Sequence, residues 1–560
     1  MTAESPNPRE SVEGVFSELW LSTGRNYFTE DRPLQLLLKH VGFKGDPNLE
    51  RLGHYVSTEM MEASHWIDRF ARPTLRKWSA TGREVDAVQV SPEHLRTVYD
   101  LLGFGVVSKA LGGERDLTYH FVSGYVISDA GFFCTITLTM QTACGLMKYG
   151  DGETRSRFLP NFLRRERPWT GATFYTEVQA GSDLGNIETV AEARGGRWLL
   201  RGLKYFASNV GLADAAIITA KPLPAVSGPR GVAAFFAPAR KEDGSPNWRV
   251  IRLKEKLGTV TVPTGEVELR DAEAYQLGDQ GQGIYVALEI LTVARIDNAI
   301  AGLGLARKAL WEAALYGSQR RAFGRRLVEH PLYLRDLVEM ESRLQANLLL
   351  SLIAAKAFSE ASAERPPYSQ DYHRARLLSH VTKNMAAWAS IELTRYAMEL
   401  MGGIGFLEEF PMAKVHRDSL VTAIWEGTSN VQSLDMAEVL FRKGLAERLM
   451  EELAAGISSV EDGEARVALV ALLEGEVKRA VAAAASDGVE HHSKHLLERL
   501  GSLIAALHYQ RWAEETSKET GEDWPLAMSR VFLESWVRRR DIPSDLVRRA
   551  SEGVSWMFGS

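Results

Sequence analysis

The sequence has 560 residues, of which 45% are hydrophobic, and a formal net charge of −6 at pH 7. A chain of this length and composition is expected to be globular and to form several domains. Cys134 and Cys144 are its only cysteines, too few for a disulfide framework or a thiolate metal site. We therefore expect a reducing compartment and no bound metal.

The acidic excess lies at the C-terminal end of the chain. Residues 446–560 carry 14 basic and 20 acidic side chains, which accounts for the whole net charge of −6. Nucleic-acid binding depends chiefly on neutralising phosphates, so this segment is a poor electrostatic match for DNA. A DNA role would need a local basic patch, and the one basic patch is the arginines at 538–540 with Arg548 and Arg549, beside Trp536.

No targeting or membrane segment is predicted. Residues 1–10 contain acid and proline where a signal peptide would need a basic start and an apolar run. The apolar stretch over 121–140 is interrupted by Ser123, Ser128, Asp129 and threonines, which makes it too polar for an uninterrupted membrane span. We expect a cytoplasmic protein without membrane contact.

Hydrophobic periodicity divides the chain into five segments. Residues 1–25 predict a disordered or extended lead-in, and the helical spacing that follows predicts a helical domain over 26–167. Short β-rich runs separated by Gly, Asp, Asn and Pro predict a β domain over 168–284. Long helices over about 284–319, 331–362 and 371–401, and another from about 430, predict a bundle over 285–445. Residues 446–560 predict a further helical domain, so the fold class is α+β and mostly α.

One acidic residue stands in an unusual local setting. Residues 424–430 read Ile-Trp-Glu-Gly-Thr-Ser-Asn. The indole of Trp425 is expected to raise the pKa of Glu426 toward that of a useful base, because an apolar neighbour makes ionisation costly. Gly427 lets a flat ligand approach the backbone. The same run also fits a helix start with Thr428 or Ser429 as N-cap, and these residues alone leave both interpretations open.

Two runs around the start of the β domain suit a flat ligand with a polar edge. Residues 176–183 read Thr-Glu-Val-Gln-Ala-Gly-Ser-Asp, a turn rich in hydroxyls and backbone N–H groups. Residues 202–209 read Gly-Leu-Lys-Tyr-Phe-Ala-Ser-Asn, in which Phe206 and Ser208 would face one side of a strand. A plain surface turn and ordinary β packing explain the two runs equally well.

Together these runs resemble the acyl-CoA dehydrogenase family, whose β-domain signature is T-E-x-x-A/G-G-S-D followed by G-x-K-x-W-I-T-N. Phe206 and Ser208 stand where the family has Trp and Thr, and they keep a ring and a hydroxyl. Residues 319–324 are similar to the family's Q/E-R-x-x-F-G, 401–405 to its L-G-G-x-G, and 425–428 to its Y/W-E-G-T/S. The resemblance implies an N-terminal helical domain, a central antiparallel β domain, a C-terminal four-helix bundle and an appended helical domain.

The resemblance implies FAD as the cofactor and Glu426 as the catalytic base. The implied flavin contacts before and within the β domain are Thr173, Tyr175, Thr176, Gly181, Ser182, Phe206, Ala207 and Ser208. Those implied in the bundle are Arg320, Phe323, Gly402, Gly403, Trp425, Gly427, Thr428 and Asn430. Arg320 and the Gly402–Gly403 turn would hold the pyrophosphate and adenine half of a neighbouring subunit's cofactor. Ser182 and Arg295 are the implied substrate contacts.

Within the family the chain is similar to AidB-like flavoproteins, including the run Arg-Leu-Lys-Glu-Lys-Leu-Gly at 252–258 and the appended C-terminal region. The resemblance implies an acyl-CoA substrate, α-proton abstraction by Glu426, β-hydride transfer to flavin N5, an acceptor such as electron-transfer flavoprotein, and a homotetramer. The alternative function is that of an AidB-like flavoprotein that mainly binds or protects DNA and has weak dehydrogenase activity. A third interpretation is an oxidase that uses O₂ or a nitro compound, since the same fold hosts related flavin oxidases.

Overall fold

The computed structural model describes residues 19–279 and 281–558. The chain folds as two compact units. The first unit comprises Met1–Glu62, Gly124–Ser128 and Asn298–Ser560, and the second comprises Ala63–Ser123 and Asp129–Asp297. The five-segment division stays a prediction, and most of its lead-in over 1–25 falls outside the described residues.

The second unit combines helices with a hairpin that the sequence did not predict. Strands β1 (Thr74–Trp78) and β2 (Glu84–Gln89) pair antiparallel inside the region predicted to be helical. The hairpin forms because residues 74–78 alternate between exposed and half-buried side chains and Gly82 supplies a positive φ of 79° at the turn. The helices of this part of the chain are α4 (Met61–Phe70), α5 (Pro92–Gly103), α6 (Ser108–Leu111), α7 (Leu117–Ile127), α8 (Ala130–Tyr149) and α9 (Gly152–Leu163).

The β domain is a seven-stranded sheet in the order β3-β6-β4-β5-β9-β7, with β8 paired to β9 and β6 also paired to β7. Most pairs are antiparallel, as predicted, but β3 and β4 each run parallel to β6. The strands are β3 (Gly171–Phe174), β4 (Val190–Arg194), β5 (Arg197–Ser208), β6 (Ala215–Pro222), β7 (Ala233–Pro238), β8 (Arg249–Leu253) and β9 (Thr264–Leu277).

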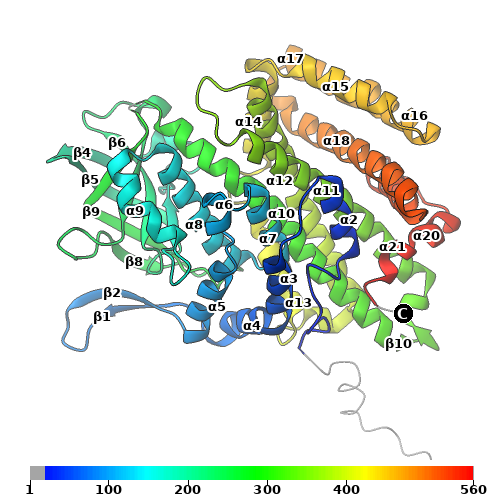
Figure 1. Cartoon of the computed structure of the whole chain (residues 1–560), viewed down its shortest axis with the longest axis horizontal. Helices are drawn as coiled ribbons and strands as arrows, with labels where there is room; N and C mark the ends of the chain where they lie inside the picture. Colours follow the sequence, from blue (N-terminus) through cyan, green and yellow to red (C-terminus); the bar gives the residue numbers. More distant parts are fainter. Residues whose placement is uncertain (1–18, 280, 559–560) are drawn as a thin grey trace, which may run out of the picture. The chain divides into compact units, whose positions relative to one another are not determined.

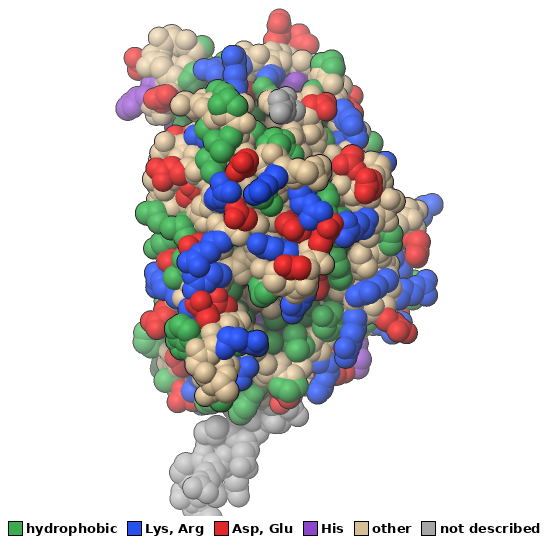
Figure 2. Space-filling view, turned by 90° about the vertical axis from the view of Figure 1, so that its left-hand side faces the viewer, with side chains coloured by type: hydrophobic (Ala, Val, Ile, Leu, Met, Phe, Trp, Pro, Cys, Tyr) green, Lys and Arg blue, Asp and Glu red, His purple; other side chains and the backbone are tan. Residues whose placement is uncertain are grey.

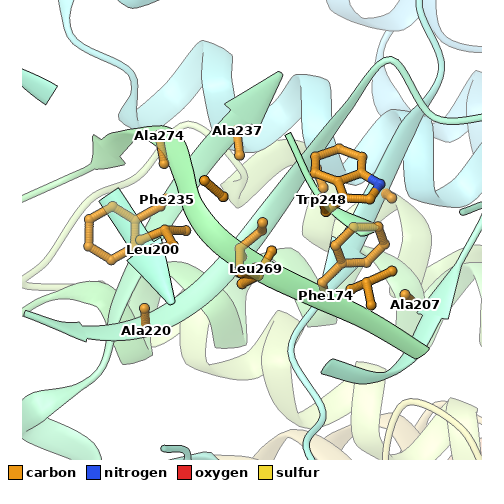
Figure 3. Packing of buried hydrophobic residues seen from close by; sticks show 14 of the residues in the cluster. Phe174, Leu200, Ala207, Ala220, Phe235, Ala237, Trp248, Leu269 and Ala274 are labelled. Atoms are coloured by element: carbon orange, nitrogen blue, oxygen red, sulfur yellow. The ribbon is translucent and has the colours of Figure 1, made fainter. Parts of the chain in front are cut away.

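The core of the β domain is built from alternate side chains of these strands. Phe174, Leu200, Phe235 and Leu269 are at most 2% exposed, and Figure 3 shows them packed together with Trp248. Burying an aliphatic or aromatic side chain of this size contributes about 1.5–3 kcal/mol. This core fixes the ends of β3 and β5, where the predicted flavin contacts lie.

The first unit contains the long helices of the bundle. Helix α10 (Gly283–Gln319) enters it from the second unit, and α11 (Pro331–Ala361), α12 (Gln370–Leu400) and α14 (Ser429–Ala437) follow the predicted boundaries closely. Pro331 is the first residue of α11, and the Ser369 side chain accepts a hydrogen bond from the Tyr372 backbone N–H at the start of α12. The unit also contains shorter elements. Before α10 these are α2 (Arg32–His40), α3 (Pro47–Tyr55) and the π-helix η1 (Val56–Met60); between α10 and α11 they are β10 (Arg321–Ala322), β11 (Arg325–Arg326) and η4 (Leu327–Glu329); and around α12 to α14 they are η5 (Gly402–Phe406), α13 (Pro411–Leu420), η6 (Val421–Ala423) and η7 (Glu438–Arg442).

The predicted C-terminal helical segment packs on this bundle. Its longest helix, α18 (Val489–Thr520), lies against α11, α12 and α14, while α15 (Ala446–Ser458), α16 (Gly463–Leu472) and α17 (Lys478–Ser486) cover its other side (Figure 1). The Tyr509 hydroxyl donates a 2.8 Å hydrogen bond to Gln345 of α11 in a fully buried setting. The remaining elements are η8 (Leu473–Val477), α19 (Trp524–Val531), η9 (Phe532–Val537), α20 (Ser544–Ala550) and α21 (Glu552–Ser555).

Within the described residues, α8 is the one helix long and apolar enough to cross a membrane, with a mean hydropathy of 1.3 over its most apolar window. That window is 83% buried inside the protein, as in a core helix. The visible face in Figure 2 carries basic and acidic side chains intermixed rather than one large patch of a single sign.

Candidate functional site

The predicted site residues divide between the two units. Thr173, Tyr175, Thr176, Gly181, Ser182, Phe206, Ala207, Ser208 and Arg295 belong to the second unit. Arg320, Phe323, Gly402, Gly403, Trp425, Glu426, Gly427, Thr428 and Asn430 belong to the first.

The second unit brings the two β-domain motifs together. The Tyr205 backbone N–H on β5 donates a 2.8 Å hydrogen bond to the carbonyl of Thr176, which follows β3. The Phe206 ring beside it is 51% exposed, and the Ser208 hydroxyl lies 3.0 Å from that of Thr264 on β9. An aromatic face and neighbouring hydroxyls therefore lie at one edge of the sheet, while Ala207 points into the core.

Glu177 and Lys204 support this edge, and neither was predicted as a site residue. The Lys204 ammonium lies 2.7 Å from the Glu177 carboxylate and 3.2 Å from the Tyr175 carbonyl. The same carboxylate accepts hydrogen bonds from the Glu188 N–H at 2.7 Å and the Thr189 hydroxyl at 2.5 Å. These contacts tie the 176–189 loop to β5. Glu177 lies in the 176–183 motif and Lys204 in the 202–209 motif, so their places in these motifs could have indicated a role at the site.

For both Lys204 and Glu177, burial and the ion pair shift the pKa in opposite directions. Burial lowers the pKa of Lys204 to about 8, against the raising effect of Glu177. Burial raises the pKa of Glu177, but the Lys204 charge and the hydrogen bonds to Lys204 and Thr189 outweigh it, so that pKa is lowered overall. Both groups are therefore charged near neutral pH.

The turn that carries Gly181 and Ser182 is exposed, and hydrogen bonds of the neighbouring residues stabilise it. The Glu177 N–H donates to the Ala180 carbonyl at 2.8 Å, which closes the turn. Asp183 then caps the next turn, because its carboxylate accepts from the Gly185 N–H at 3.1 Å. Gly181 and Ser182 are left at the surface of their unit.

Arg295 lies on α10 and is only 3% exposed. Two residues along the helix, the Asp297 carboxylate lies 3.1 Å from the His120 imidazole, and both side chains are buried. The substrate role predicted for Arg295 stays a prediction.

In the first unit, Glu426 lies in a tight turn between η6 and α14. Its φ is +58°, and that of Gly427 is +100°. Left-handed backbone costs a residue with a side chain roughly 1–2 kcal/mol, whereas glycine adopts it freely. Non-glycine residues in this conformation concentrate at functional sites, where surrounding contacts hold them. The helix-cap interpretation also holds in part, because Thr428 is the N-cap residue of α14 by backbone position, although its side chain makes no capping hydrogen bond.

Contacts on both sides hold the Glu426 turn, and their residues were not predicted. On α10, the Asn298 side chain accepts a hydrogen bond from the Trp425 indole N–H and donates one to the Thr422 carbonyl at 3.0 Å. On the other side, Gln432 of α14 and Lys383 of α12 donate hydrogen bonds to the turn's carbonyls. No sequence pattern links these positions to residue 426, so only the fold reveals them.

The start of α14 presents Thr428 and Asn430 at the surface. Between them, the Ser429 hydroxyl accepts a 3.0 Å hydrogen bond from the Trp388 indole N–H on α12. The Gln432 N–H donates to the Thr428 carbonyl at 2.9 Å, the first helical bond. The Trp388 ring is 44% exposed, so an aromatic surface stands beside the Glu426 turn.

Arg320, Phe323, Gly402 and Gly403 lie apart from the Glu426 turn. Arg320 and Phe323 occupy the exposed turn between α10 and α11, where Phe323 is 96% exposed with a φ of +52°. Gly402 and Gly403 begin η5, and a Cβ added to either would meet no atom within 4 Å.

The C-terminal arginine patch is partly neutralised. Arg538 pairs with Glu534 at 2.7 Å, and Arg549 pairs with Asp523 at 2.6 Å. Arg539 and Arg540 are exposed. Among residues 19–279 and 281–558, no group of three or more His, Cys, Asp or Glu side chains could hold a metal ion.

The sequence matches two family models. Residues 172–272 match the acyl-CoA dehydrogenase middle domain, and residues 281–441 match the acyl-CoA dehydrogenase C-terminal domain. The chain is 30% identical to the AidB protein of Escherichia coli over 401 residues, which covers 68% of this chain and 71% of that protein.

Solved structures share the fold over nearly the whole chain. The structure of Caenorhabditis elegans ACDH-11 in complex with C11-CoA matches with a TM-score of 0.79 and 24% identity, covering 93% of this chain and 91% of that one. An acyl-CoA dehydrogenase from Bacillus anthracis complexed with FAD matches with a TM-score of 0.69 and 18% identity, covering 97% of this chain and 90% of that one. The likeness therefore extends into the C-terminal helical segment.

Proposed function

Because this chain belongs to the acyl-CoA dehydrogenase family, we propose that it is an FAD-dependent enzyme that desaturates an acyl-CoA thioester between its α and β carbons, with Glu426 as the base. The observation that carries the proposal is the Glu426 turn. The Glu426 backbone is left-handed, and hydrogen bonds tie the turn to α10, α12 and α14, so the point from which the side chain leaves the turn is fixed, as a positioned base requires.

Within each unit, taken by itself, the predicted residues fit a part of FAD. In the second unit, the half-exposed Phe206 ring beside the Thr176 loop and Ser208 suits a flat ring with a polar edge. In the first, exposed Arg320 suits a pyrophosphate, because a guanidinium pairs bidentately with phosphate oxygens. The open backbone at Gly402 and Gly403 suits close approach of a ligand.

The chemistry assigned to this chain is proton removal. Glu426 takes the α-proton, and the electron pair of that C–H bond becomes the new C=C bond while the β-hydrogen leaves as hydride. FAD, when bound, supplies the acceptor for that hydride. A positioned base of this kind contributes typically about 10²–10⁴-fold to the rate.

Glu426→Gln tests this role directly. The variant should bind FAD and remain yellow, while acyl-CoA should bleach the flavin about 10²–10⁴-fold more slowly under anaerobic conditions. Glu447→Gln, an exposed acid on α15, is the matched control and should bleach at the wild-type rate. Wild-type bleaching by Glu426→Gln would remove Glu426 from this role.

Oligomerisation and the electron acceptor are further parts of the proposal. The exposed Arg320, Phe323, Gly402 and Gly403 suit contact with another subunit's cofactor, and we propose a homotetramer. Light scattering of the FAD-loaded protein should give four times the mass of one chain. We also propose an acceptor such as electron-transfer flavoprotein and a cytoplasmic location.

A second candidate function is DNA binding by an AidB-like flavoprotein. The exposed Arg539 and Arg540, together with what the resemblance to AidB-like flavoproteins implies, favour it. The ion pairs of Arg538 and Arg549 and the −6 charge of residues 446–560 weigh against it. A DNA retardation assay separates the two functions.

A further inference from the structure

The carbonyl groups of Glu426 and Gly427 accept hydrogen bonds from two buried side chains of the bundle. The Gln432 side-chain amide donates hydrogen bonds to the Glu426 carbonyl at 2.8 Å and to the Gly427 carbonyl at 3.1 Å. The Lys383 side-chain amine donates to the Gly427 carbonyl at 2.7 Å. Two consecutive carbonyls thus converge on two side chains that are at most 1% exposed.

The donors of this arrangement are themselves fixed. The Gln432 amide oxygen lies 2.9 Å from Nδ1 of the His380 imidazole, which is fully buried one turn of α12 before Lys383. The two carbonyls can only accept, so the amide nitrogen faces the turn and the amide oxygen faces His380. The left-handed turn aims these part-buried carbonyls at the two donors, so the hydrogen bonds favour it over turns that would lose them.

We propose that Gln432 and Lys383 are positioning residues for the Glu426 carboxylate, an inference that rests on the proposed role of Glu426 as the base. Their hydrogen bonds keep the backbone of Glu426 and Gly427 left-handed, and that conformation sets the direction in which the Glu426 side chain leaves the turn. Removing either donor lets the turn relax toward ordinary backbone and moves the carboxylate away from its working position.

Gly427 is part of the same device. A Cβ at this position would lie 2.6 Å from the Gln432 amide nitrogen and 3.1 Å from a Val431 methyl carbon. A side chain here would therefore displace the amide that holds the turn. Glycine is required for this close approach as well as for its φ of +100°.

The test uses Gln432→Met and Lys383→Met in the full-length, FAD-loaded protein. Each keeps an unbranched side chain of similar length and removes the donor. At saturating acyl-CoA, the rate constant of flavin bleaching per bound flavin should fall about 10²-fold, the cost of misplacing a catalytic group by about 1 Å. The acyl-CoA concentration at half-saturation should change less than threefold, because neither side chain is proposed to touch the substrate.

A matched control separates positioning from general loss of stability. Lys308 is also a buried lysine of the first unit that donates to a backbone carbonyl, that of Ser128 at 3.0 Å. Lys308→Met should lower the melting temperature as Lys383→Met does, yet its bleaching rate per bound flavin should equal that of the wild type. Equal slowing in Lys308→Met and Lys383→Met would overturn the proposal.

A double-substitution cycle shows whether Gln432 acts through Glu426. Glu426→Gln combined with Gln432→Met should bleach no more slowly than Glu426→Gln alone, because residues that act as a unit are not additive. Additive slowing would overturn the proposal. Flavin bleaching at the wild-type rate in Glu426→Gln would overturn the proposed function itself. Slow bleaching in Glu426→Gln with wild-type bleaching in Gln432→Met would overturn only the positioning role of Gln432.

A readout independent of turnover completes the test. In hydrogen–deuterium exchange without acyl-CoA, the peptide covering 421–432 should exchange faster in Gln432→Met than in the wild type. In Lys308→Met the same peptide should exchange at the wild-type rate. Should Gln432→Met fail to fold, Gln432→Asn keeps the amide on a shorter side chain and should show an intermediate rate and exchange. Wild-type rate and exchange in every folded Gln432 variant would overturn the proposal.

Discussion

Lys204 and Glu177 form an ion pair at 2.7 Å inside the β domain, and neither side chain is more than 4% exposed. The pair joins β5 to the loop that follows β3, which carries the predicted flavin contacts Thr176 and Ser182. A buried pair of this kind is weak evidence for net stability, but breaking it leaves an uncompensated charge. It therefore enforces the loop's conformation.

Removing one member of the pair should cost more than removing both. Lys204→Met should lower the free energy of unfolding by about 3–5 kcal/mol, because Glu177 is left buried without its cation. Adding Glu177→Gln to that variant should recover part of the loss. Denaturant unfolding of the two single variants and the double variant measures this coupling, and simple additivity would contradict it.

Stability should depend on pH through the same pair. The pKa of Glu177 is lowered below its ordinary 4.5, so its contribution is present above about pH 4.5 and is lost as pH falls through the folded-state pKa. The pKa of Lys204 is lowered from 10.5 to about 8. Between about pH 8 and pH 10.5, Lys204 is therefore protonated in the unfolded chain but not in the folded protein, so stability rises with pH.

Comparison with Lys204→Met isolates the lysine's part of this pH dependence. The stability of the wild type relative to that variant should increase between pH 7.5 and 10, as measured by denaturant unfolding at each pH. A difference that shrinks over this range would contradict the lowered pKa of Lys204.

Punctuating residues explain how much of the fold could be predicted. Pro331, Ser369 and the Gly402–Gly403 pair mark helix ends, and α11 and α12 begin and end within one residue of prediction. The β1–β2 hairpin was missed because its strands of 5 and 6 residues are short and sit between helices. Short elements of this kind depend on tertiary packing more than on local pattern.

The site was predictable only where motifs carry it. The motif around 425–428 indicated Glu426, but nothing in the sequence indicates its positive φ, because glutamate does not favour that conformation. Lys383 lies 44 residues before Gly427 along the chain. Side chains that donate hydrogen bonds to the carbonyls of a turn can be of several types and can lie far from the turn along the chain. They are therefore identified only from the three-dimensional structure.

DNA binding through the arginine patch should be weak. At about 150 mM salt we expect no retardation of a short duplex by the full-length protein, because residues 446–560 carry a net −6. Arg539→Ala with Arg540→Ala is the informative variant, and Arg549→Ala, whose charge is already paired with Asp523, is its control. Retardation that persists at this salt and is lost only in the double variant would support the AidB-like alternative.

An oxidase would differ from a dehydrogenase in how its reduced flavin meets oxygen. We expect the acyl-CoA-reduced protein to reoxidise slowly in air, since the proposed acceptor is another protein. Stopped-flow mixing of reduced protein with aerated buffer, followed by flavin absorbance, measures this. Reoxidation as fast as reduction would favour the oxidase interpretation instead.

The C-terminal end of the chain should contribute to the stability of the bundle. The Trp311 indole N–H on α10 donates to the Met557 carbonyl at 2.9 Å, and the Trp556 ring lies 4.9 Å from that of Trp311 in an edge-on arrangement. The Arg307 guanidinium lies 5.1 Å from the Trp556 ring, a cation–π distance. The last described residues thus cover the buried face of α10.

Trp556→Ala should therefore lower the free energy of unfolding by about 2 kcal/mol, less than the roughly 3–5 kcal/mol of a fully buried aromatic because Trp556 is only half-buried. Trp78→Ala is the matched control, since that ring is 58% exposed on β1 and its loss should cost less than about 0.5 kcal/mol. Denaturant unfolding of both variants measures the difference. Equal costs would mean that Trp556 does not stabilise α10, whereas a larger cost for Trp556→Ala would show that its contacts with Trp311 and Arg307 contribute to the stability of the bundle.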